Sequence, residues 1–135
     1  MRFAYLSTFH PFRGGIAQFN ARLMRELESQ GHAVSPYTFT TQYPENLFPG
    51  KTQMVTAEDV ADPINAPRVV SSIGPFSWPS AARTIAEGKP EVLLMKYWMS
   101  FFGPSLGSVS GALRKRGVKA ITMLDNVIPH EKRFF

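Results

Sequence analysis

The densest group of chemically active side chains lies near the end of the sequence. Asp125, Asn126, His130 and Glu131 fall within seven residues that follow an apolar, strand-like run. A carboxylate there could act as a base, the amide could orient a substrate, and the imidazole could carry a proton. The alternative is structural, with Asp125 and Asn126 capping a turn and His130 in solvent. Asp125 and His130 are the candidate catalytic residues.

A second candidate is the glycine pair Gly14-Gly15, which lies between a strand-like run and a helical pattern that begins at Ile16. Free N–H groups at a helix start attract an anion, and glycine lets a phosphate or a sugar approach the backbone closely. The pair belongs neither to a G-x-G-x-x-G fingerprint nor to a Walker loop, so NAD and ATP have no direct support. A tight turn without a ligand is the alternative.

A third group follows the apolar run Val92–Met95. Lys96 is followed by an aromatic segment, residues 97–102, that contains Trp98, Phe101 and Phe102. Aromatic faces stack on sugars and nucleobases, but a place in the core or in a domain contact is equally open. Ser105 lies in Gly103-Pro104-Ser105-Leu106-Gly107, which has the G-x-S-x-G spacing, but Gly103-Pro104-Ser105 is expected to open a helix, and the spacing alone does not establish a serine hydrolase.

The elements that must position these residues alternate between strand and helix. Strands are expected at Phe3–Leu6, Ala33–Thr40, Val69–Ile73, Val92–Met95 and Val118–Leu124. Helices are expected from Ile16 to Gly31, from an N-cap at Ser77 to near Gly88, and from Gly103 to Gly117. This alternation predicts an α/β, Rossmann-like parallel sheet of about five or more strands, in which ligands bind beyond the carboxyl ends of the strands.

Two stretches depart from this regular pattern. Pro36 lies inside the second strand, which implies a bulge or an edge position because proline cannot donate to a ladder. Periodicity is lost from residue 41 to residue 67, where prolines recur. A loop of this length in a compact domain is usually functional or mobile.

Composition limits the class of protein. The chain has 135 residues, enough for one domain, with 44 % hydrophobic and 19 % charged residues, which excludes a disordered or fibrous protein. No apolar run approaches the roughly 20 residues of a membrane span, and no signal peptide is evident, so we expect a cytoplasmic protein. The absence of cysteine excludes disulfides, thiolate metal sites and cysteine nucleophiles.

The net charge of +5 is concentrated late in the chain, at Arg114, Lys115, Arg116 and Lys119. These cations fit a solvated helix end, where they favour the helix dipole, or a contact with an anionic membrane surface. Aromatic and basic residues do not alternate as single-stranded nucleic acid would require, so nucleic acid is not an expected partner.

Taken together, the sequence resembles the N-terminal domain of a family-4 glycosyltransferase of the GT-B class. The resemblance covers nearly the whole chain, in the order Gly14-Gly15-Ile16, Glu28 to Val34, Gln42-Tyr43-Pro44, Leu47 to Gln53, Lys96-Tyr97-Trp98 and Asp125 to Glu131. It implies transfer of a sugar from a nucleotide-sugar to a glycan or glycolipid acceptor, in a cleft between two Rossmann-like domains and without a metal or other cofactor. Polysaccharide biosynthesis, with peripheral membrane contact, is the implied setting.

The resemblance also assigns roles to particular residues. The N-terminal domain binds the acceptor, and its glycine loop, here Gly14 and Gly15, faces the donor diphosphate. Asn126, Lys96 and Trp98 are the further substrate-binding candidates. Where the family usually has a histidine in a Thr-x-His pattern, this sequence has Asp125, which puts that histidine's role in doubt.

The nucleotide-binding C-terminal domain of the family is absent from residues 1–135. We therefore expect this chain to be a fragment, inactive alone, whose partner is its own missing domain. The rival interpretation is a non-catalytic, partner-binding Rossmann-like module that docks through Trp98, Phe101, Phe102 and the terminal Phe134 and Phe135. A third is a different Rossmann-like nucleotide binder.

Overall fold

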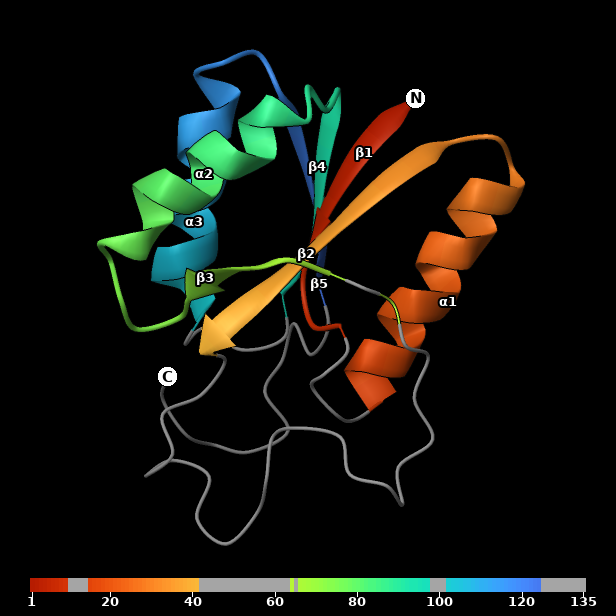
Figure 1. Cartoon of the computed structure of the whole chain (residues 1–135), viewed down its shortest axis with the longest axis horizontal. Coiled ribbons are helices and arrows are strands. Elements are labelled where there is room, and N and C mark those ends of the chain that lie inside the picture. The colour runs from red at the N-terminus through yellow and green to blue at the C-terminus, as the bar shows by residue number, and fades with distance from the viewer. Residues whose placement is uncertain (10–14, 42–63, 65, 98–101, 125–135) are drawn as a thin grey trace, which may run out of the picture.

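The structure is a computed structural model that describes residues 1–9, 15–41, 64, 66–97 and 102–124. Strands and helices alternate along this part of the chain (Figure 1): β1 (Arg2–Leu6), α1 (Gly15–Ser29), β2 (Ala33–Thr41), β3 (Arg68–Ser71), α2 (Ser77–Glu87), β4 (Val92–Tyr97), α3 (Gly103–Arg114) and β5 (Lys119–Leu124). Every strand and helix expected from the apolar periodicity is present.

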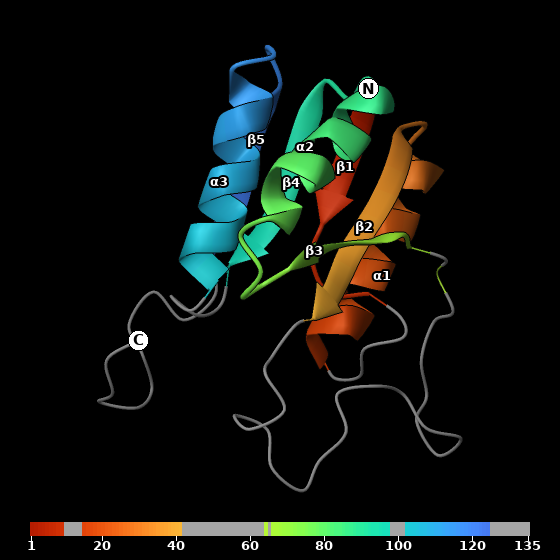
Figure 2. The ribbon, with the colours of Figure 1, turned by 60° about the vertical axis from the view of Figure 1, so that its left-hand side comes forward.

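The five strands form one parallel sheet in the order β3-β2-β1-β4-β5. The chain builds outward from β1 to β3, then crosses back to place β4 on the other side of β1. Helix α1 covers one face of the sheet, and α2 and α3 cover the other (Figures 1 and 2). The predicted α/β, Rossmann-like fold is confirmed.

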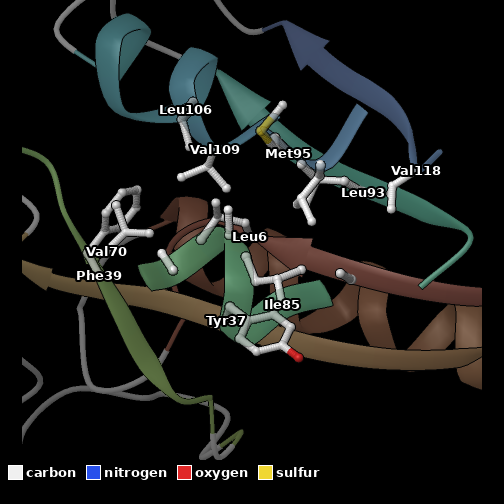
Figure 3. Close-up of a cluster of buried hydrophobic side chains, with 14 of the residues drawn as sticks. Leu6, Tyr37, Phe39, Val70, Ile85, Leu93, Met95, Leu106, Val109 and Val118 are labelled. Atoms are coloured by element: carbon white, nitrogen blue, oxygen red, sulfur yellow. The ribbon is translucent and has the colours of Figure 1, made fainter. Parts of the chain in front are cut away.

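Each face of the sheet has its own hydrophobic core, because successive side chains of a strand point to opposite faces. Beneath α2 and α3, Leu6 and Leu93 pack with Ile85 and Val109 (Figure 3). Beneath α1 lies a second cluster of buried side chains: Tyr5, Phe9, Ala21, Met24, Val34, Ile64, Ala66 and Leu94. Packing on both faces fixes β1 and β4, the two strands whose carboxyl ends lie at the centre of the sheet edge.

β2 is not an edge strand, but Pro36 lies at a local edge of it, which fits one of the two expected settings. β2 lies between β1 and β3, and Pro36 pairs with Tyr5. Alternate residues of β2 bond to opposite neighbours: the Tyr37 carbonyl accepts from β1, while the Thr38 N–H donates toward β3. Pro36 therefore faces the β3 side, just before the β3 pairing begins at Thr38, and its missing N–H breaks no ladder bond there. The register irregularity of β2 falls later, between Thr38 and Thr41.

The turn before α2 also differs from expectation. Ser77 is the first helical residue and Phe76 is the N-cap, which makes no side-chain capping bond. The Ser77 hydroxyl instead donates to the Gly74 carbonyl (2.7 Å) and accepts from the Ser71 N–H (3.0 Å). The indole N–H of Trp78 donates to the Ser71 carbonyl (2.7 Å). Ser77 thus stabilises the loop that leaves β3 rather than the free N–H groups of the helix.

Two glycines give a matched test of backbone conformation. Gly31 follows α1 with φ +92°, whereas Gly107 lies inside α3, and an added Cβ would meet nothing within 4 Å at either site. Gly31→Ala should lower the free energy of unfolding by about 1 kcal/mol, because a side chain is strained at positive φ. Gly107→Ala should raise it by about 0.5–1 kcal/mol. Urea denaturation measures both, and a loss at Gly107 would contradict the helical assignment.

Candidate functional site

The candidate site lies where β1 and β4 end side by side. In open parallel sheets, a ligand crevice forms beyond the carboxyl ends of adjacent strands whose connections run in opposite directions. β1 connects through α1 on one face, and β4 connects through α3 on the other. Leu6, the last residue of β1, pairs with Met95, so Lys96 of β4 lies beside the segment that begins at Ser7.

The side chain of Asn20, in α1, holds this segment by hydrogen bonds. Its side chain is fully buried, and the amide donates to the Ser7 Oγ and to the Thr8 carbonyl, both at 2.9 Å. The Asn20 Oδ1 accepts from the Tyr5 hydroxyl at 2.5 Å. Both amide hydrogens and the carbonyl oxygen therefore have partners, as burial of an amide requires.

β2 holds the same segment from the other side. The Phe9 N–H donates to the Thr38 Oγ1 at 3.2 Å, and Thr38 is itself fully buried. The Phe9 ring packs edge-on against Tyr5, with 5.0 Å between ring centroids. The backbone that leaves β1 is thus fixed by side chains from α1 and from β2.

Lys96 places a positive charge at this edge. Only 5 % of the residue is exposed, and its Nζ lies 3.7 Å from the ring centroid of Phe19, in the second turn of α1. Such a cation–π contact stabilises the ammonium group. The first turn of α1, beginning at Gly15, contains no acidic residue. The buried ammonium thus contacts the second turn of the helix whose first turn carries the positive end of the dipole, and both favour an anion.

The structure describes only part of the predicted site. Lys96 lies at the sheet edge as expected, and Gly15 is the first residue of α1. The other candidates lie outside the described residues: Gly14, Trp98, Asp125, Asn126 and His130.

For Phe102 the structure decides between the alternatives left open by the sequence. Its side chain is fully buried and packs against Phe39, with 5.4 Å between ring centroids, so the core alternative is confirmed and docking to a partner through Phe102 was a wrong expectation. Phe102 therefore belongs to the core beneath α2 and α3. Its neighbour Phe101 lies outside the described residues.

Sequence reasoning missed Asn20 and the loop after β3. Asn20 lies four residues after Ile16 and four before Met24, so a polar residue at the buried helical spacing was the available signal. After β3, the loop exposes two large apolar side chains, Ile73 (52 %) and Phe76 (96 %). The apolar run predicts Ile73 as the last residue of the third strand, but β3 ends at Ser71 and Ile73 lies in the loop. Phe76 belongs to no periodic pattern.

The Tyr37 hydroxyl and the late basic cluster lie at the opposite end of the sheet, where the strands begin. Burial, together with the charge of Glu87, raises the pKa of Tyr37, whose hydroxyl lies near Gly88 at the end of α2. The exposed cations of the late basic cluster surround the end of α3 and the start of β5. They lie where β4 and β5 begin, whereas Lys96 lies near the end of β4.

Among the residues that the structure describes, no three His, Asp or Glu side chains gather as metal ligands would. No described helix combines the length and apolarity needed to cross a membrane. Comparison of the chain with protein-family models, with curated proteins and with solved structures gives no match. Function is therefore inferred from the fold and from the residues at this sheet edge.

Proposed function

We propose that this chain is the acceptor-side, N-terminal domain of a glycosyltransferase. The intact enzyme would transfer a sugar from a nucleotide-sugar to a glycan or glycolipid acceptor. The observation that supports this most is the contact of Lys96, at the carboxyl ends of β1 and β4, with Phe19 in the second turn of α1. A helix N-terminus and a buried ammonium together suit the two negative charges of a diphosphate.

The proposed chemistry uses these charges where they matter most. The acceptor hydroxyl oxygen forms the new bond to the sugar carbon, and its proton passes to the departing diphosphate or to water. As the bond between the sugar carbon and the diphosphate oxygen breaks, that oxygen keeps the electron pair and negative charge grows on the diphosphate. Groups already aimed at that charge stabilise the transition state more than the ground state. Gly14, Gly15 and Lys96 would serve this role, while Asp125 or His130 would orient the sugar. Trp98 and Asn126 would contact the bound substrates.

A titration of the isotope-labelled chain with UDP-glucose and with GDP-mannose, followed by amide NMR, tests this proposal. At least one of the two should shift the amide signals of Gly15, Ile16 and Lys96. Uridine and guanosine, which lack the diphosphate, are the controls and should leave these signals in place. If neither nucleotide-sugar moves them, the proposed donor contact is wrong.

A second candidate is the non-catalytic, partner-binding module. The observation that favours it is the exposed pair Ile73 and Phe76, held on a loop that the side chains of Ser71 and Ser77 fasten by hydrogen bonds. Aromatic residues are enriched in protein interfaces. The same titration separates the two candidates, because a binding module predicts no response at Gly15 or Lys96 to either nucleotide-sugar.

A further inference from the structure

Asn20 is a polar side chain in a place that packing alone would give to an apolar one. It is fully buried, bonds to Tyr5 of the cluster beneath α1, and lies at helical spacing from Met24 of the same cluster. An amide buried there is stable only because all its hydrogen-bonding groups are satisfied. A satisfied buried network contributes less to net stability than to fixing one arrangement of the groups it joins.

The arrangement that Asn20 fixes is that of α1 relative to the end of β1. Its two donated bonds go to consecutive residues, Ser7 and Thr8, that follow the last residue of β1. Asn20 itself lies one and a half turns into α1, so the network ties the helix start to this short segment. The Phe9 N–H bond to Thr38 then extends the fixed region by one residue.

We propose that Asn20 is a positioning residue. Its side chain holds Ser7, Thr8 and the start of α1 in the geometry that receives the anionic part of a ligand. The link to an anion rests on the proposed function, while the mechanical role of Asn20 does not. Displacement of a helix terminus by a fraction of an ångström weakens each of the N–H contacts that it can offer, and an ordered site avoids the entropic cost of ordering on binding.

Amide hydrogen exchange on the full chain tests the mechanical role. The Ser7 N–H donates to the Tyr37 carbonyl and the Phe9 N–H to Thr38, so both report on the segment. In Asn20→Ala, their protection should fall about tenfold more than that of the β4 amides. The control is Leu113→Ala, a buried site on the opposite face of the sheet, which should lower protection without this bias. Equal loss at all amides in Asn20→Ala would overturn the proposal.

A milder variant covers the case in which Asn20→Ala does not fold. Ser7→Ala removes one acceptor of the network and leaves the Thr8 and Tyr5 bonds in place. It should loosen the amides of residues 7 and 9 in the same selective way but to a smaller extent. If Ser7→Ala leaves the protection of both amides unchanged, the hydrogen-bond network does not hold this segment in place.

Binding of inorganic pyrophosphate, followed by the same amide signals, tests the link to function. The dissociation constant should rise about tenfold in Asn20→Ala and stay unchanged in Leu113→Ala, which a general loss of stability would not produce. An unchanged affinity in Asn20→Ala would overturn the link between Asn20 and the anion. If the unaltered chain does not bind pyrophosphate, the proposed donor site fails, whereas the exchange data still decide the role of Asn20.

Discussion

Phe102→Ala is expected to lower the free energy of unfolding by about 3–5 kcal/mol, the usual cost of removing a fully buried aromatic ring. Phe102 immediately precedes α3 and packs against Phe39 of β2, so one side chain joins a helix start to the sheet. Its loss leaves a cavity among Leu106, Val70 and the other residues of the α2–α3 core, and a well-packed core collapses only partly into such a space. Urea or thermal denaturation measures the change.

Phe76→Ala is the matched control for this prediction. Phe76 precedes α2 just as Phe102 precedes α3, and both residues have right-handed helical backbone angles without a capping side chain. They differ in burial, since 96 % of Phe76 is exposed and none of Phe102. Phe76→Ala should change stability by less than about 0.5 kcal/mol. Similar losses in both variants would mean that the two rings act through the helix start rather than through packing.

This pair also shows what apolar periodicity can and cannot predict. The order of strands and helices follows from spacing, because a repeat of two or of 3.6 residues is set by local geometry. Whether a given phenylalanine beside a helix start is buried depends on what the other elements place opposite to it. Phe102 meets Phe39, which is distant in sequence, whereas Phe76 meets nothing comparable. That information resides in the tertiary arrangement.

The candidate site likewise has one part that could be predicted from the sequence and another that could not. Lys96 and Gly15 could be placed at the carboxyl edge from the sequence, because strand ends and helix starts meet there in any parallel sheet. The side chain that holds the edge together, Asn20, was not predicted, since its partners Ser7 and Thr8 become neighbours only when α1 packs on β1. Pro36 shows a local rule that holds at one residue: the β3 side of β2 is unpaired there because β3 pairing begins at Thr38, although β2 as a whole lies inside the sheet.

Lys96→Met is expected to separate binding from stability. Methionine can occupy much of the space of the lysine stem, so the expected loss of stability is that of the contact with Phe19, about 0.5–2 kcal/mol. Under the proposed function, loss of the ammonium removes a charge-assisted bond to the donor diphosphate. Such bonds contribute about 1.5–3 kcal/mol, so the dissociation constant for pyrophosphate or for a bound nucleotide-sugar should rise at least about tenfold.

Lys119→Met provides the control, because it removes the same charge from the exposed start of β5, at the opposite edge of the sheet. If long-range attraction by the net positive charge were responsible for anion binding, the two variants would weaken it equally and added salt would abolish the effect. A local site predicts a large effect at Lys96 and almost none at Lys119, measured at the same ionic strength. Equal affinities in both variants and in the unaltered chain would show that the buried ammonium of Lys96 does not contact the anion.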